Sequence, residues 1–118
     1  MNTGVRVDEV FAALADPTRR DVLEALANRG ASSASGMARI LPVSRQAIAK
    51  HLQIMEEAGL VSGHKQGREL CFEVQPRALL ATARWMERAA LRWEQRLDRI
   101  KDIAESLERP LERPSPES

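Results

Sequence analysis

The sequence predicts a mainly helical fold with one small β-hairpin, and three features of the 118 residues support this prediction. Apolar residues recur at spacings of three and four over most of the chain, which is the period of an amphipathic helix. The period changes to two where Leu70, Phe72 and Val74 alternate with Glu69, Cys71 and Glu73, as in a half-buried strand. The polar residues 64–68, which include one glycine, precede this strand and predict the turn of a hairpin.

Capping residues mark where the helices before the hairpin begin. A first short helix is expected from apolar residues at helical spacing, namely Val7, Val10, Phe11 and Leu14. Asp16 followed by Pro17 predicts the start of a second helix, because aspartate caps well and proline is tolerated at the first helical position. Its apolar stripe is expected to be Val22, Leu23, Leu26 and Ala27.

Two further helices are expected before the hairpin. Ser33 or Ser35 is positioned to cap a short helix, which Pro42 ends because proline cannot donate a backbone hydrogen bond. The apolar residues of this short helix are Met37, Ile40 and Leu41. Ser44 is expected to cap the next helix, whose buried side consists of Ile48, Leu52 and Met55.

Pro76 begins a last helix with an unbroken apolar seam. The seam alternates spacings of four and three through Leu79, Ala83, Met86, Ala90, Trp93, Leu97, Ile100, Ala104 and Leu107. A helix that continues to Arg109 would be roughly 50 Å long, which is more than so small a domain covers. We therefore expect dimerisation through Met86, Ala90, Trp93, Leu97, Ile100, Ala104 and Leu107. In the alternative, residues 79–86 pack on the chain's own core and only the remainder is intermolecular.

These elements predict a domain over residues 1–75, a dimerisation helix over 76–109 and a disordered tail over 110–118. The single cysteine, Cys71, excludes an intrachain disulfide and fits a reducing cytoplasm. No apolar run is long enough for a membrane span or a signal peptide. The net charge of +1 does not by itself indicate nucleic acid, so a binding surface would need local clustering of basic residues.

Two helices joined by a short turn and followed by a hairpin form the pattern of a winged helix-turn-helix. The helix from Ser44 carries short polar and basic residues near its start, which suits entry into the major groove of double-stranded DNA. Arginine pairs well with guanine and glutamine with adenine, whereas hairpin-tip cations reach phosphates or the minor groove. The expected DNA-binding residues are Ser44, Arg45, Gln46, Ala49, Lys50, His51, Lys65 and Arg68.

Several polar and basic residues also have a purely structural interpretation. DNA contact is the favoured interpretation of Arg45, Gln46 and Lys50, and a solvated helix surface is the alternative. His51 is expected either to hydrogen-bond a phosphate or to pack against the hairpin. Arg19 or Arg20 lies near the DNA backbone or forms an ion pair with Asp16 or Glu24.

The segments ALADPTRRDVLEAL and VSRQAIAKHLQIMEEAGLVSGHKQGRELCFEV resemble the ArsR-type family of bacterial winged-helix repressors. The resemblance covers roughly residues 8–75. It implies a homodimer, formed through its N- and C-terminal helices, that binds a palindromic operator and represses transcription. The C-terminal segment with Trp85, Trp93 and RLDRI resembles a subgroup with a long dimerisation helix.

Many members of that family sense metal ions, and this chain departs from their patterns. The stretch SASGMARIL has no Cys-x-Cys pair, and no histidine follows His64. Because Cys71, His51 and His64 lie on different expected elements, no convergent zinc site is expected. We therefore expect neither a bound metal nor a cofactor. We also expect that the protein is not an enzyme, because the chain lacks a phosphate-binding glycine loop and a catalytic triad pattern.

Two other functions stay open at this point. The first is the same repressor induced by a small organic ligand at the dimer interface. The second is a helical protein–protein adaptor with a degenerate winged domain, which the long heptad helix permits. Cys71 is expected to be an inert packing residue of its strand, and a redox switch is the alternative.

Overall fold

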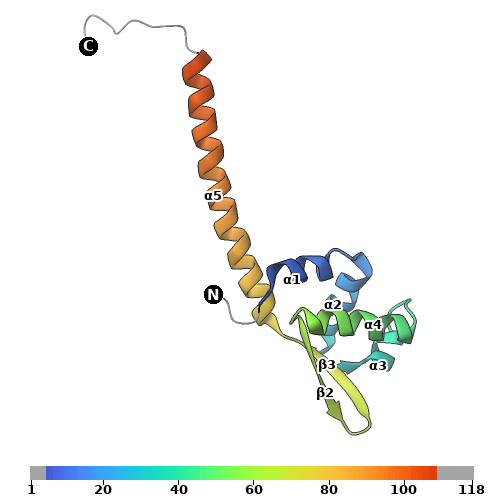
Figure 1. Cartoon of the computed structure of the whole chain (residues 1–118). Helices are drawn as coiled ribbons and strands as arrows, with labels where there is room; N and C mark the ends of the chain where they lie inside the picture. The colour runs from blue at the N-terminus through green and yellow to red at the C-terminus, as the bar shows by residue number, and fades with distance from the viewer. Residues whose placement is uncertain (1–4, 109–118) are drawn as a thin grey trace, which may run out of the picture. The chain divides into compact units, whose positions relative to one another are not determined.

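The computed structural model describes residues 5–108, with eight helices and strands in this part of the chain. In chain order they are α1 (Val7–Leu14), α2 (Pro17–Arg29), β1 (Ser32–Ser33), α3 (Ala34–Ala38), α4 (Arg45–Glu57), β2 (Val61–Gln66), β3 (Glu69–Val74) and α5 (Pro76–Glu108) (Figure 1). The expectation of a mainly helical fold with a small hairpin is confirmed. The tail expected over residues 110–118, and the helix end expected at Arg109, lie outside the described residues.

The chain divides into two compact units, one ending at Arg84 and the other beginning at Trp85, so that α5 contributes to both. Within the described residues, no helix is both long and apolar enough to cross a membrane.

The predicted capping residues lie where the helices begin. The Asp16 carboxylate accepts from the backbone N–H groups of Thr18 (2.8 Å) and Arg19 (3.2 Å), with Pro17 as the first residue of α2. The hydroxyl of Ser44 accepts from the Ala47 N–H (3.1 Å) at the start of α4. At α3 the cap is Ser33 rather than Ser35, and its Oγ accepts from the Gly36 N–H (3.1 Å). These side chains satisfy N–H groups that have no partner inside their helices.

The sheet has three antiparallel strands in the order β1-β3-β2. β2 and β3 form the expected hairpin, in which Gln66 pairs with Glu69 across a turn of two residues. Gly67 adopts a φ of +64° there, as the first central position of a type II′ hairpin turn requires. β1 was not expected from the sequence, which predicted only a connection of small residues, and it pairs Ser32 and Ser33 with β3.

The burial of β3 differs from simple alternation. Leu70, expected to face inward, is 48% exposed, whereas Cys71 and Phe72 are each only 6% exposed. Leu70 pairs with Lys65 towards the hairpin tip, and Cys71 and Phe72 each have a strand neighbour on both sides. The Phe72 ring lies over Gly63, where an added Cβ would approach ring Cε2 to 2.8 Å. This close approach explains the glycine in β2.

One hydrophobic core joins the helices to the sheet. Its largest fully buried side chains are Val10, Val22, Leu26, Met37, Ile48, Leu52, Met55, Leu60 and Val61. Three expected core residues are instead exposed: Phe11 (37%), Ile40 (47%) and Ala27. Ile40 is exposed because α3 ends at Ala38, earlier than the expected end at Pro42.

The first turns of α5 pack on this core through a face that only partly follows the predicted seam. Leu79 packs against the core as expected. Ala78 and Thr82, each 2% exposed, are the buried positions beside it, whereas Ala83 and Met86 of the seam are exposed. The sequence did not identify this face, because Thr82 is polar and Ala78 lies outside the regular seam of larger apolar residues.

Candidate DNA-binding site

The rotation of α4 is fixed by its apolar side. Ile48, Leu52 and Met55 are completely buried, and at helical spacing they leave the opposite side of the helix to solvent. The exposed side begins with the capping residue Ser44 and contains Arg45, Gln46, Ala49 and Lys50, all of which were expected from the sequence. Gln53 is also exposed and follows Ala49 by one turn, but it had not been singled out.

A groove of about 750 Å³ separates α4 from the hairpin. It brings together four of the predicted DNA-binding residues: Arg45 and Ala49 from α4, and Lys65 and Arg68 from the hairpin. Its remaining lining comes from Ser33, Ala34, Ser35, Gln53, Glu56, Glu69, Leu70 and Phe72. Gln46 and Lys50 are exposed on α4 without lining this groove.

The cations around the groove are available to a ligand. Within residues 5–108, Arg45, Lys50, Lys65 and Arg68 form no ion pair with a carboxylate. Glu56, which also lines the groove, is held by the hairpin, because its Oε2 accepts from the Gly63 N–H at 3.1 Å. The arrangement therefore offers unpaired positive charge and side-chain amides on an exposed helix, as an anionic duplex requires.

Arg19 and His51 lie on the other flank of α4. Arg19 forms an ion pair with Asp16 (3.7 Å), one of the two arrangements expected for it. Arg20 instead donates to the Leu14 carbonyl (2.6 Å). His51 is half-buried, and its Nδ1 accepts from Nε of Arg19 at 3.4 Å. Its contact with α2 could not be expected from the sequence.

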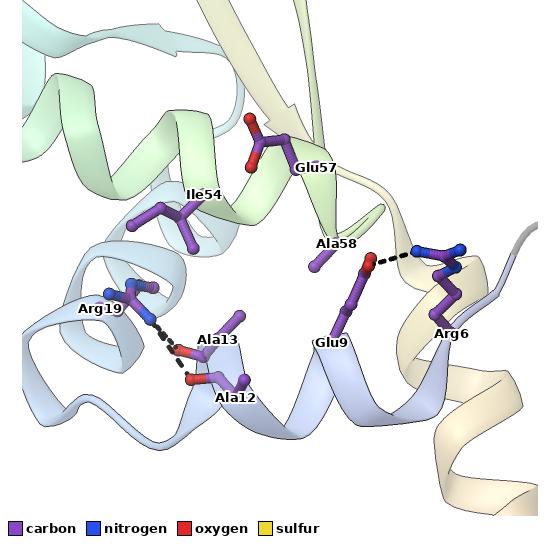
Figure 2. A pocket seen from close by; sticks show the side chains of 8 residues that line it. All are labelled: Arg6, Glu9, Ala12, Ala13, Arg19, Ile54, Glu57 and Ala58. Carbon is purple, nitrogen blue, oxygen red and sulfur yellow. Dashed lines mark hydrogen bonds and ion pairs between the residues drawn. The ribbon is translucent and has the colours of Figure 1, made fainter.

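A second cavity, of about 650 Å³, lies on this flank and is shown in Figure 2. Its lining includes Arg19, together with Arg6 and Glu9, which form an ion pair at 2.7 Å. The helix α4 contributes Ile54 and Glu57 to this lining. The pKa of Asp16 lies below its ordinary value, mainly because its carboxylate accepts from the Arg19 backbone N–H. Burial acts in the opposite direction and is the next largest effect on this pKa, whereas the Thr18 N–H and the charge of Arg19 lower the pKa by smaller amounts.

Metal-ligating side chains are dispersed in the described part of the chain, where no three of His, Cys, Asp or Glu gather around one point. Cys71 is buried in β3, with Ser33 and His64 as its register partners on the neighbouring strands.

The chain is similar in sequence to known helix-turn-helix proteins. Residues 14–64, which include α2, α3 and α4, match the family model described as a helix-turn-helix domain. The chain is 38% identical to the HTH-type transcriptional regulator Rv2034 of Mycobacterium tuberculosis, over 69% of this chain and 75% of that protein. It is 31% identical to the transcriptional repressor SdpR of Bacillus subtilis, over 68% of this chain and 88% of that protein.

Among solved structures, an ArsR-like transcriptional regulator from Rhodococcus sp. RHA1 is similar, with a TM-score of 0.76 and 48% sequence identity. The similarity covers 83% of this chain and 92% of that one. A second similar structure, that of the ArsR family transcriptional regulator RHA00566, has a TM-score of 0.65 and 33% identity, over 75% of this chain and 90% of that one. The chain therefore belongs to the ArsR family of winged helix-turn-helix transcriptional regulators.

Proposed function

We propose that this regulator binds a specific double-stranded DNA site as a homodimer and represses transcription from it. One observation carries the proposal: the first half of α4 presents Arg45, Gln46, Ala49 and Lys50 to solvent without carboxylate partners in the described residues. The completely buried side of the helix holds these residues outward, and Arg45 and Ala49 share a groove with the hairpin cations Lys65 and Arg68. Membership of a family of transcriptional regulators supports the same conclusion.

In this proposal α4 is the recognition helix and lies in the major groove. Arg45 and Gln46 are at its start, where side chains of recognition helices reach base edges. Ala49 is small, so the helix backbone can approach the bases closely. Lys50 and the Ser44 hydroxyl contact phosphates, together with the first N–H groups of the helix.

The hairpin serves as the wing. Lys65 and Arg68 are exposed near its tip and share a groove with Arg45. Their charges attract phosphates, and this attraction contributes affinity that does not depend on sequence. We assign base recognition to α4 and backbone attachment to the wing.

The homodimer is proposed to form mainly through α5, and α1 is proposed to contribute a second part of the interface. From Trp85 onward the large apolar residues of the seam are exposed in the single chain: Met86 (46%), Trp93 (54%), Leu97 (64%), Ile100 (56%) and Leu107 (80%). Ala90 and Ala104 complete the stripe. A continuous exposed stripe at heptad spacing favours a second copy as its partner. A two-fold dimer requires an inverted-repeat operator, with half-sites about one helical turn apart.

Fluorescence anisotropy tests this function with the purified chain, the duplex upstream of its own gene and a scrambled duplex, at two salt concentrations. We expect preference for the native duplex by ~10³-fold or more at both concentrations. Weak binding to both duplexes that disappears at the higher salt would leave only non-specific electrostatics. That result would favour a co-ligand, such as a small organic effector, or the adaptor function that the apolar stripe of α5 would permit.

A further inference from the structure

Arg19 is held in place from several sides. Its guanidinium donates to the carbonyl of Ala13 (3.0 Å) and, at 3.4 Å, to that of Ala12, both at the end of α1 (Figure 2). It also lies 3.7 Å from the Asp16 carboxylate, and only 13% of its side chain is exposed. A side chain with these contacts has little freedom to turn away.

The remaining contact of Arg19 reaches the recognition helix. Its Nε donates to Nδ1 of His51 at 3.4 Å, which joins two residues 32 positions apart. A guanidinium has only donors and stays charged in proteins. Nδ1 must therefore carry a lone pair and no proton, and a neutral imidazole of this kind has its proton on Nε2.

The other ring nitrogen of His51, Nε2, remains available for a hydrogen bond to a ligand. Within residues 5–108, Nε2 of His51 has no hydrogen-bond partner, and it is not among the buried polar atoms that lack one. His51 follows the exposed Lys50 directly on α4. The fixed tautomer therefore presents an N–H donor to solvent at the flank of the helix that we place in DNA.

We infer that Arg19 is a positioning residue that keeps His51 in the Nε2–H tautomer, so that His51 donates a hydrogen bond to a DNA phosphate as a neutral imidazole. The phosphate contact rests on the proposed DNA-binding function, whereas the tautomer is a property of the free protein. Arg19 itself does not touch the duplex in this arrangement. Its effect on DNA passes through His51.

Nitrogen-15 NMR of the full-length free protein tests the tautomer, at a pH where titration shows both histidines to be neutral. We expect His51 to be in a single form, with Nε2 protonated and Nδ1 not. The exposed His64 serves as the control in the same spectrum and should exchange between both forms. In Arg19→Met, His51 should exchange as well. A protonated Nδ1, or identical behaviour of His51 and His64 in the unchanged protein, would overturn the inference even if Arg19→Met does not fold.

A matched pair of substitutions tests the phosphate contact. His51→Gln keeps an N–H donor at the position of Nε2, and His51→Asn keeps only a group at the position of Nδ1, which can still accept from Arg19. We expect His51→Asn to weaken binding about tenfold on native and scrambled duplexes alike, as loss of one hydrogen bond to a charged group does. The affinity of His51→Gln for both duplexes should fall much less. Equal effects of the two substitutions would contradict the contact.

The salt dependence separates a neutral donor from a charged one. Replacing a neutral imidazole should leave the slope of log affinity against log salt unchanged, because no counterion is released on its account. A slope reduced by about one in His51→Asn would show that His51 binds as a cation, against the inference. If the unchanged protein binds no duplex specifically while the tautomer is as expected, the proposed function fails and the link between Arg19 and His51 remains.

Discussion

Asp16 stabilises the start of α2 in two ways, and its negative charge strengthens both. Its carboxylate accepts from the N–H groups of Thr18 and Arg19, and it also lies within 3.7 Å of the Arg19 guanidinium. The backbone hydrogen bond from Arg19 is the main reason why the pKa of Asp16 is lower in the folded chain than its ordinary value of 3.8.

A depressed carboxyl pKa makes stability depend on pH in a defined direction. The contribution of Asp16 is fully present above its ordinary pKa of 3.8 and is lost as the pH falls from there through the lower folded value. We compare Asp16→Asn, which still caps the helix but cannot ionise. In urea titrations the unchanged protein should be the more stable at neutral pH, and the difference should shrink below about pH 4. A difference that stays constant through this range would contradict the assignment.

Single residues were predicted well where the interaction is local. The sequence identified Asp16 and Ser44 because a cap and its N–H partner lie two or three positions apart. The contact between Arg19 and His51 joins α2 to α4 and leaves no trace in local spacing. The exposure of Gln53 follows from the rotation of α4, which the buried Ile48 and Leu52 set.

The wing and α4 are separate elements with separate tasks in the proposed complex. Lys65 and Arg68 contribute charge, whereas Arg45 and Gln46 read bases. Charge neutralisation appears in the salt dependence of binding and not in the preference among sequences. Substitutions in the two elements should therefore have different signatures.

For the wing, we expect the double substitution Lys65→Ala and Arg68→Ala to lower affinity for native and scrambled duplexes by similar factors. The slope of log affinity against log salt should fall by roughly one for each cation removed. Anisotropy titrations over a range of salt measure both quantities. Arg88→Ala on α5, an exposed cation outside the groove, is the control. A wing variant with an unchanged slope and lost sequence preference would contradict this division.

The longer elements were predicted from their periodicity. α2, α4, α5 and the hairpin each span several turns or alternations. β1 has two residues, Ser32 and Ser33, and so short a strand has no period. The alternation in β3 was recognised, but it placed Leu70 inside and Cys71 outside. The position of Cys71 between Ser33 and His64 decides its burial, and this depends on a strand that the sequence did not indicate.

The whole molecule is proposed to act as a two-fold dimer. The seam of α5 is regular over nine positions, yet its residues from Met86 onward are exposed in the single chain. Burying side chains such as Trp93 and Leu97 against a second copy would remove a large apolar surface from water. The sequence predicted the seam because heptad spacing is local. It did not identify the inward face of the first turns, where Ala78 and Thr82 are buried.

Leu97→Asp tests the dimer, because it places a charge in the middle of the seam. We expect sedimentation equilibrium to show twice the chain mass of 13.2 kDa for the unchanged protein and the single chain mass for this variant. Leu91→Asp is the matched control, since Leu91 is similarly exposed on α5 but lies off the seam. The affinity of Leu97→Asp for the operator should also fall, because the dimer is lost. A dimer that survives Leu97→Asp unchanged would place the interface elsewhere.

The central claim is that α4 reads a specific DNA sequence. The most direct measurement is the ratio of the dissociation constants for scrambled and native upstream duplexes, compared between the unchanged protein and a variant with Arg45→Ala, Gln46→Ala and Lys50→Ala. We predict a ratio of ~10³ or more for the unchanged protein. In the variant, which should remain folded and dimeric, the ratio should fall close to one. A folded, dimeric variant that keeps its preference for the native duplex would contradict the account.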